Sequence, residues 1–171
     1  MLILNLAEVA RGPVRVHGEI APDAPLWEDT EVALAGPLRV DIDARTVGDG
    51  VLVRGEIRGG FETSCRRCLA PLAVDVRDDM DVFFERLTPE EVAEAELGGE
   101  VHALPQRGDR LDLGPTIREQ VLLRIPEYVL CAESCRGLCP RCGVNLNRET
   151  CGCVPPVDEG PWGGLKKIRF D

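Results

Sequence analysis

The sequence predicts an α+β fold that is mainly β: a small antiparallel sheet or barrel, one packed amphipathic helix and a C-terminal segment of clustered cysteines. Apolar and polar residues alternate through much of the first 86 positions, which is the period of half-buried strands. Residues 115–125 have helical spacing, and six of the eight cysteines fall within residues 131–153. We therefore expect a β-rich domain with two short helices over residues 1–130 and a cysteine-rich segment with its tail over residues 131–171.

Three strands are predicted by this alternation. Residues 38–45 alternate between aliphatic and charged side chains, and the turn sequence 47–50 leads into a second alternating run that begins at Val51. These two runs form an antiparallel hairpin in our interpretation. A third strand is expected over residues 72–84, and weaker ones over residues 14–20 and 31–35.

Two helices are predicted from their start and stop signals. Thr88, followed by proline and two glutamates, is typical of a helix N-terminus, so a short exposed helix is expected over residues 88–100. Residues 115–125 form the amphipathic helix, which Pro126 ends. We expect the polar stretch 100–110 between them to be mobile. The apolar face of the second helix comprises Ile117, Val121, Leu122 and Ile125.

Charge and the N-terminal sequence restrict the function. The first apolar run is too short for a signal-peptide core, and no stretch approaches the roughly 18 apolar residues of a membrane span, so a cytoplasmic location without membrane attachment is expected. The net charge of -10 argues against sequence-independent binding of nucleic acid. Five arginines near the cysteines nevertheless form a candidate surface for RNA or a protein partner: Arg66, Arg67, Arg136, Arg141 and Arg148.

The cysteines predict a metal-binding protein. Disulfides are rare in a reducing cytosol, and neither histidine lies among the cysteines, so the ligands would be thiolates. Cys139-Pro-Arg-Cys142-Gly143 is the strongest local motif, because C-P-x-C-G is typical of zinc knuckles. The glycine tolerates the positive φ of a tight knuckle. We interpret the C-terminal segment as a zinc knuckle.

Eight cysteines provide two sets of four, which matches the tetrahedral coordination of zinc. We favour two Zn²⁺ ions. The first would be bound by Cys139, Cys142, Cys151 and Cys153, which are close in sequence; the second would be bound by Cys65, Cys68, Cys131 and Cys135. Other divisions stay open, because Cys151-x-Cys153 is tight for two ligands of one ion.

Three other interpretations of the cysteines stay open. Iron is the chemical rival of zinc, because tetrathiolate knuckles accept both metals. Disulfides would replace metal in an oxidising compartment. A reactive dithiol at Cys65 and Cys68 would resemble redox proteins, but those motifs open a helix, whereas this one joins two predicted strands.

No catalytic constellation or small-molecule site is evident. The sequence has no phosphate-binding glycine motif of the G-x-x-x-x-G-K-[ST] or G-x-G-x-x-G type, and no G-x-S-x-G. The acidic run near residue 90 is the exposed face of a predicted helix in our interpretation. We therefore expect a protein that is not an enzyme.

The order of these motifs resembles a known family. An alternating N-terminal half is followed by C-R-R-C-L at residues 65–69, a helix ending in L-L-R-I-P at 122–126, and C-A-E-S-C-R-G-L-C-P-R-C-G-V-N-L-N at 131–147. This combination resembles the YceD family, the large ribosomal RNA subunit accumulation proteins of bacteria and plastids. The resemblance implies a factor needed for normal levels of large-subunit ribosomal RNA, with no known catalytic activity.

Candidate partners are a ribosomal RNA precursor or a large-subunit ribosomal protein, the latter because an acidic body complements a basic protein. Two other functions compete with ribosome biogenesis. One is a zinc-stabilised scaffold for other proteins, and the other is a redox protein of the rubredoxin-like or dithiol type.

Overall fold

The computed structural model describes residues 2–30, 32–88, 91 and 101–153. A five-stranded sheet has the order β2-β3-β4-β5-β6, and a two-stranded sheet pairs β1 with β7. The strands are β1 (Ile3–Asn5), β2 (Val14–Ile20), β3 (Leu38–Val47), β4 (Gly50–Ser64), β5 (Pro71–Glu85), β6 (Val101–Ala103) and β7 (Arg110–Asp112). The helical elements are α1 (Leu6–Val9), the 3-10 turn η1 (Pro25–Trp27) and α3 (Gly114–Arg124).

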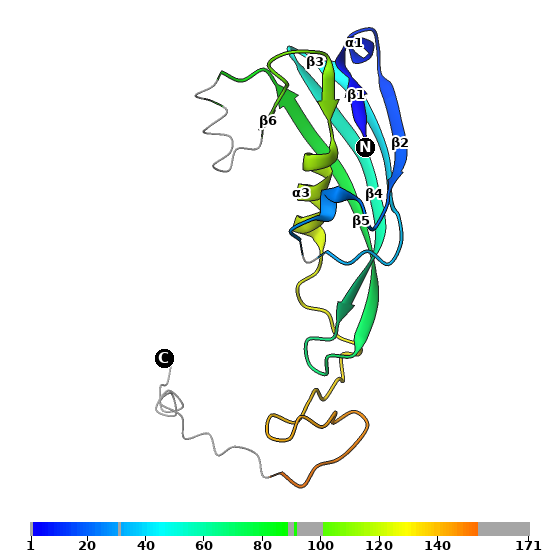
Figure 1. Cartoon of the computed structure of the whole chain (residues 1–171), viewed down its shortest axis with the longest axis vertical. Helices are drawn as coiled ribbons and strands as arrows, with labels where there is room; N and C mark the ends of the chain where they lie inside the picture. The colour runs from blue at the N-terminus through cyan, green and yellow to red at the C-terminus, as the bar shows by residue number, and fades with distance from the viewer. Residues whose placement is uncertain (1, 31, 89–90, 92–100, 154–171) are drawn as a thin grey trace, which may run out of the picture.

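The prediction of a mainly β fold with one packed helix is confirmed. β2 to β5 form a continuous antiparallel meander, and β6 adds in parallel to β5. Within the described residues the sheet is open, so the barrel alternative is wrong. β4 and β5 extend beyond the other strands as a two-stranded ribbon, at the end of the molecule far from α1 (Figure 1).

The alternation of side chains builds the core on one face of the sheet. Over residues 38–45 of β3 the aliphatic residues are buried and the charged ones are exposed, because successive side chains point to opposite faces. α3 packs against the apolar face, where Ile117 and Val121 are buried. The largest fully buried side chains are Leu4, Val9, Leu38, Val40, Ile42, Val53, Phe61, Met80, Leu113 and Ile117, together with Cys65, which lies just beyond the end of β4.

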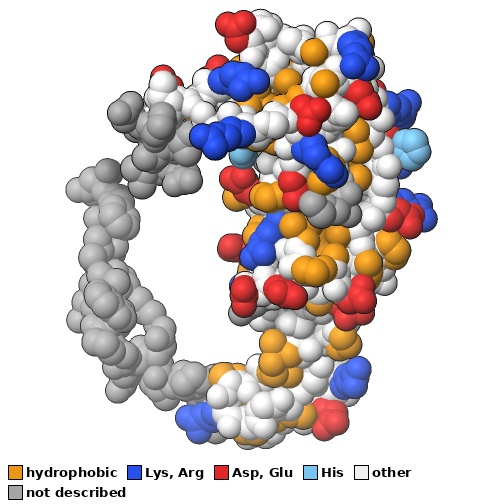
Figure 2. Space-filling model, turned by 45° about the horizontal axis from the view of Figure 1, so that its top comes forward, with side chains coloured by type: hydrophobic (Ala, Val, Ile, Leu, Met, Phe, Trp, Pro, Cys, Tyr) orange, Lys and Arg blue, Asp and Glu red, His pale blue; other side chains and the backbone are white. Residues whose placement is uncertain are grey.

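The opposite face is a lattice of charged side chains. Arg15 binds Asp41 at 2.9 Å, Arg39 binds Glu19 at 3.2 Å and Arg54 binds Asp81 at 2.6 Å. Glu56 accepts contacts from both Arg58 and Arg77. Acidic and basic side chains are also interspersed on the side of the molecule that Figure 2 shows. This pairing leaves the net charge of the body diffuse rather than gathered on one surface.

Several local predictions need correction. Over the described residues 32–35 no strand forms: Leu34 makes a single bridge to Phe61, because β3 occupies the same edge of β4 as far as Arg58. The stretch 100–110 was predicted to be mobile, yet its two ends belong to β6 and β7. β1 and α1 were not predicted, since three or four residues are too short to show a period.

The two predicted helices have different outcomes. Thr88 and Glu91 exchange the hydrogen bonds of a capping box, with the Thr88 amide 2.8 Å from the Glu91 carboxylate. Otherwise the predicted helix 88–100 lies outside the described residues. The second helix begins at Gly114, where the amide donates to Asp112, and ends at Arg124. Leu122, placed on its apolar face by the sequence, is 44% exposed.

One ion pair fixes the end of α3 on the sheet. Asp78 lies on the buried face of β5 with its side chain 8% exposed, and Arg124 Nε lies 2.9 Å from its Oδ1. The other oxygen, Oδ2, is buried and has no hydrogen-bond partner among the described residues. Arg124 therefore compensates a carboxylate that would otherwise be both buried and unpaired.

Replacing this arginine should destabilise the protein. We expect Arg124→Met to lower the free energy of unfolding by about 1–3 kcal/mol, because a buried charged group loses its partner while the arginine itself is largely solvated. Urea denaturation measures the change. Arg39→Met is the matched control, since its partner Glu19 is exposed. A loss of similar size in both variants would contradict the assignment, as would an Asp78→Leu, Arg124→Met double variant that regains no stability.

Candidate metal centres

The first cysteine pair lies in the loop that joins β4 to β5. Cys65 follows the last residue of β4, its amide donates to Ala70 O at 2.8 Å, and the Leu69 amide donates back to Cys65 O at 2.9 Å. These bonds close a tight loop with the thiols of Cys65 and Cys68 turned inward. Both side chains are buried.

The chain after α3 meets this loop. Pro126 ends the helix, and the following segment runs beside the loop because Arg66 N donates to Val129 O at 2.9 Å. The Arg66 side chain also donates to Glu127 O at 2.7 Å. This pairing brings Cys131 and Cys135 opposite the first cysteine pair, although more than 60 residues separate them in sequence.

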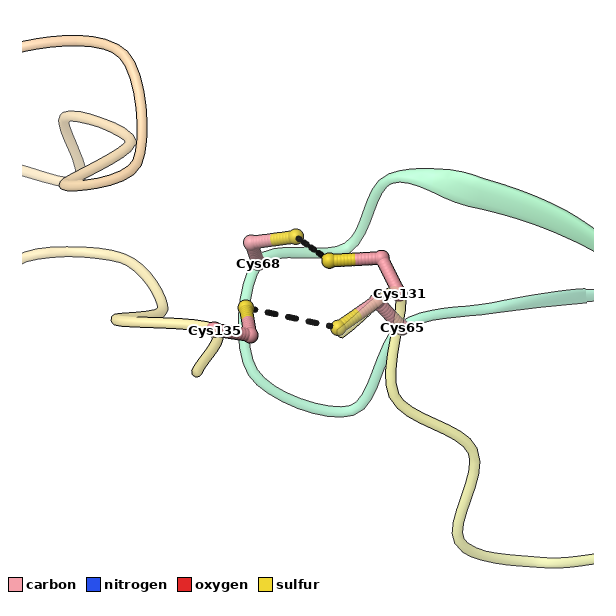
Figure 3. Close-up of side chains that lie close together, drawn as sticks. All are labelled: Cys65, Cys68, Cys131 and Cys135. Atoms are coloured by element: carbon pink, nitrogen blue, oxygen red, sulfur yellow. Dashed lines mark hydrogen bonds between the residues drawn. The ribbon is translucent and has the colours of Figure 1, made fainter. Parts of the chain in front are cut away.

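The four sulfurs of this first cluster point toward one another from the two segments (Figure 3). Cys65 Sγ lies 3.7 Å from Cys135 Sγ, and Cys68 Sγ lies 3.6 Å from Cys131 Sγ. A tetrahedral metal with metal–sulfur bonds of roughly 2.3 Å requires sulfurs about 3.8 Å apart. The sulfurs are therefore spaced as ligands of one ion, and are too far apart for a disulfide, whose sulfurs lie about 2.05 Å apart.

A second cluster forms within the cysteine-rich segment. The Gly143 amide donates to Cys139 O at 2.9 Å, and the Cys139 amide donates to Val144 O at 2.8 Å. Gly143 has φ of 73°, which is the left-handed conformation expected of the knuckle glycine. The sulfurs of Cys139, Cys142, Cys151 and Cys153 lie within 4.8 Å of one another, as do those of the first cluster.

The two clusters are the division that the sequence favoured. All eight cysteines are free thiols, and every one belongs to a group of four. Cys151 and Cys153 are separated by a single residue, yet the sulfurs of both belong to the second group of four. The cysteines thus form two groups of four thiols, each arranged so that it could hold one metal ion.

Backbone amides lower the pKa of one thiol in each cluster. The amide of Cys131, together with those of Cys68 and Arg67, lowers the pKa of Cys65 to about 6 against the effect of burial. The amides of Cys142 and Arg141 lower the pKa of Cys139 to about 6. The neighbouring thiol of Cys135 raises the pKa of Cys131 to about 12. A divalent cation would stabilise all the thiolates and release the protons that the neighbours hold.

The clusters are joined by hydrogen bonds that the sequence did not predict. Asn147, in the loop of the second cluster, donates from Nδ2 to Cys135 Sγ at 3.3 Å and accepts from the Arg136 amide at 2.7 Å. Asn147 ends the motif at residues 131–147, but the sequence has no signal for this contact. A side-chain donor to a thiolate disperses its charge, so the second loop supports a ligand of the first.

Arg67, one of the five candidate partner-binding arginines, also contacts the cysteine-rich segment. Its Nη1 donates to Cys135 O at 3.0 Å and to Glu133 O at 3.3 Å, while its own carbonyl accepts from the Leu138 amide at 3.0 Å. The Arg66 side chain likewise donates to a backbone carbonyl, that of Glu127. These hydrogen bonds of Arg67 help to hold the cysteine-rich segment on the β4–β5 loop. Arg136, Arg141 and Arg148 are exposed on the segment itself.

The chain matches a known family model. Residues 53–169 match the model described as large ribosomal RNA subunit accumulation protein YceD. No solved structure matches. Among the described residues, no helix has both the length and the apolar character needed to cross a membrane.

Relatives occur in mycobacteria and plants. The chain is 33% identical over 115 residues to the uncharacterized protein Rv2926c of Mycobacterium tuberculosis, covering 66% of this chain and 53% of the relative. It is 32% identical over 65 residues to large ribosomal RNA subunit accumulation protein YCED homolog 1, chloroplastic, of Arabidopsis thaliana, covering 38% of this chain and 20% of the relative. The chain spans about half the length of the mycobacterial relatives it matches. With a family match that includes both cysteine clusters, this chain belongs to the YceD family.

Proposed function

We propose that this chain is a non-enzymatic factor that supports accumulation of large-subunit ribosomal RNA in the cytoplasm, and that two structural zinc ions hold its cysteine-rich segment in place. The observation that carries the proposal is the pair of four-thiol clusters in a chain of the YceD family. The plant relatives carry the ribosomal role in their names.

Zinc is the metal that best suits these sites. Four thiolates complete a tetrahedron, so the sites have no open position for a substrate or water, which is typical of structural rather than catalytic zinc. Iron fits the same sulfur spacing but would add redox chemistry. A dithiol redox role is disfavoured because Cys65 and Cys68 are buried, whereas exchange needs an accessible sulfur.

The chain's own residues explain why a metal would matter at this end of the molecule. The apolar residues packed around the first cluster are Ala70, Leu72, Leu130 and Leu138, all only partly buried. So small a core contributes little to stability by itself. Metal ligation would supply the folding free energy that fixes the segment on the β4–β5 loop.

The partner in this proposal is a ribosomal RNA precursor or a large-subunit ribosomal protein. The three exposed arginines of the segment, Arg136, Arg141 and Arg148, offer contacts for either. The acidic body complements a basic protein. A zinc-stabilised scaffold unconnected to ribosomes is the alternative, and association with ribosomal particles distinguishes the two.

Metal content is the first prediction of this proposed function. Untagged protein purified without added metal should contain two zinc ions per chain by native mass spectrometry with elemental analysis, and should be colourless. Cys68→Ser and Cys142→Ser should each lose one ion, because each removes a ligand from a different cluster. One ion per chain, or the visible absorption of a ferric tetrathiolate, would contradict the two-zinc assignment.

The contact between the clusters gives a second prediction. Asn147→Ala should weaken metal binding at the first cluster by about 10–100-fold, the range typical of outer-shell partners. Competition with a chelator, followed by native mass spectrometry, measures the fraction of chains with one and two ions. Thr150→Ala, an exposed neighbour in the same loop, is the matched control. Equal metal retention in both variants would mean that the Asn147 contact has no effect on ligation.

The arginines give a third prediction. Reversing Arg136, Arg141 and Arg148 to glutamate should reduce co-sedimentation with large-subunit precursor particles at least tenfold at moderate salt, because each contact with phosphate depends on charge. The control reverses three exposed arginines of the body, Arg11, Arg45 and Arg107. If both triple variants sediment like the wild type, the basic-surface part of the proposal is wrong; if the wild type does not sediment, the ribosomal role is wrong.

A further inference from the structure

β2 leaves one edge of the five-stranded sheet unpaired in the described part of the chain. It is the first strand in the order β2-β3-β4-β5-β6, and its seven residues pair with β3 alone. It lies at the outer side of the sheet in Figure 1. The main-chain groups that point away from β3 therefore have no strand partner, and a row of such groups is a template for pairing with another chain.

The charged face of the sheet ends at this edge with a basic residue. Directly opposite residues on β5, β4, β3 and β2 form a row across the sheet: Asp81, Arg54, Asp43 and Arg15. All four residues are exposed, and their charges alternate in sign along the row. Opposite charges that face each other on neighbouring strands stabilise the pairing, whereas like charges destabilise it. The position beyond Arg15 accordingly favours an acidic residue.

β2 supplies that acidic residue when it pairs with a second copy of itself. In an antiparallel pairing centred on His17, Arg15 lies opposite Glu19 of the second copy, and Glu19 lies opposite Arg15 of that copy. Directly opposite residues have their side chains on the same face of a sheet. Both pairs of opposite charges would therefore form on the charged face, and the alternation of the row would continue into the second copy.

The core face of β2 fits the same register. Val14 would face Ile20 of the second copy, and Val16 would face Gly18. Val14 and Val16 are only partly buried against the core of a single chain, so a second sheet at this edge would cover more of their apolar surface. Each pair joins positions of the same alternation, so the outward main-chain groups of the two copies meet each other.

We propose that two copies of this chain associate through β2 about a two-fold axis at His17, which joins their five-stranded sheets into one continuous sheet. This inference goes beyond the proposed function and does not depend on it. A two-fold interface is self-complementary, so the contact between Arg15 and Glu19 occurs twice. The observation that selects a second copy over an unrelated strand is that the charged and apolar residues of β2 match β2 itself.

The association should be weak. A single pair of strands is a small interface, so we expect a dissociation constant of about 10–100 µM. The net charge of -10 on each chain opposes association at long range. Salt at physiological concentration screens exposed charges that are more than about 8 Å apart, whereas the opposite charges at the interface are in direct contact. Self-association is therefore measured at that ionic strength, at protein concentrations on both sides of the expected constant.

Two charge reversals test the register. Arg15→Glu places acidic residues opposite each other, and Glu19→Arg places basic residues opposite each other, so each variant should self-associate at least tenfold more weakly than the wild type in sedimentation velocity. An equimolar mixture of the two variants restores both pairs of opposite charges. The mixture should form a heterodimer with the affinity of the wild type, which native mass spectrometry distinguishes by its mass.

The matched controls are Arg86→Glu and Asp79→Arg, exposed positions after and within β5, and both should self-associate like the wild type. The Arg15 and Glu19 side chains are 65% and 57% exposed, so their variants should keep the circular dichroism spectrum of the wild type. A wild type that stays monomeric overturns the inference without any variant. Reversals that do not weaken self-association, or a mixture that does not associate, overturn it as well. Co-sedimentation with ribosomal particles separately tests the proposed function.

Discussion

The arrangement of the cysteine-rich end depends on the contact between the β4–β5 loop and the chain that follows α3. Cys65 and Cys68 come from the loop, and Cys131 and Cys135 come from the later segment, so the first cluster closes a long stretch of chain. The backbone bond from Arg66 to Val129 sets the register of the two segments. Without this closure the second cluster would have no fixed position relative to the sheet, since Leu138 and Asn147 both contact groups of the first.

The sheet and the cysteine clusters are stabilised by different interactions. The sheet buries a large apolar face under α3 and is stable through side-chain packing. The tip of the ribbon has few apolar residues and relies on thiols, backbone hydrogen bonds and Arg67. Function in our proposal belongs to the second region, because it presents the exposed arginines Arg136, Arg141 and Arg148 on a segment that the thiol clusters hold in place.

Long elements could be predicted from the sequence, and short ones could not. The alternation of residues 38–45, and the less regular one of residues 72–84, predicted β3 and β5 because each strand turns one side toward the core and the other toward solvent. Segments of three residues, such as β1 and β7, have no measurable period; they are strands because they pair with each other. Residues 32–35 were predicted to be part of a strand from their apolar side chains, yet they form none. β3 already pairs with most of that edge of β4, so only a single bridge from Leu34 to Phe61 forms.

The sequence by itself determined the donor set: eight thiols, no histidine ligand nearby, and a C-P-x-C-G knuckle whose glycine suits a left-handed backbone. Proximity in sequence also favoured the correct grouping. Only the tertiary structure decided that Asn147 supports Cys135 and that Arg67 binds backbone carbonyls. The reason is physical: ligand chemistry is local to a residue type, whereas these contacts depend on how two distant segments are aligned.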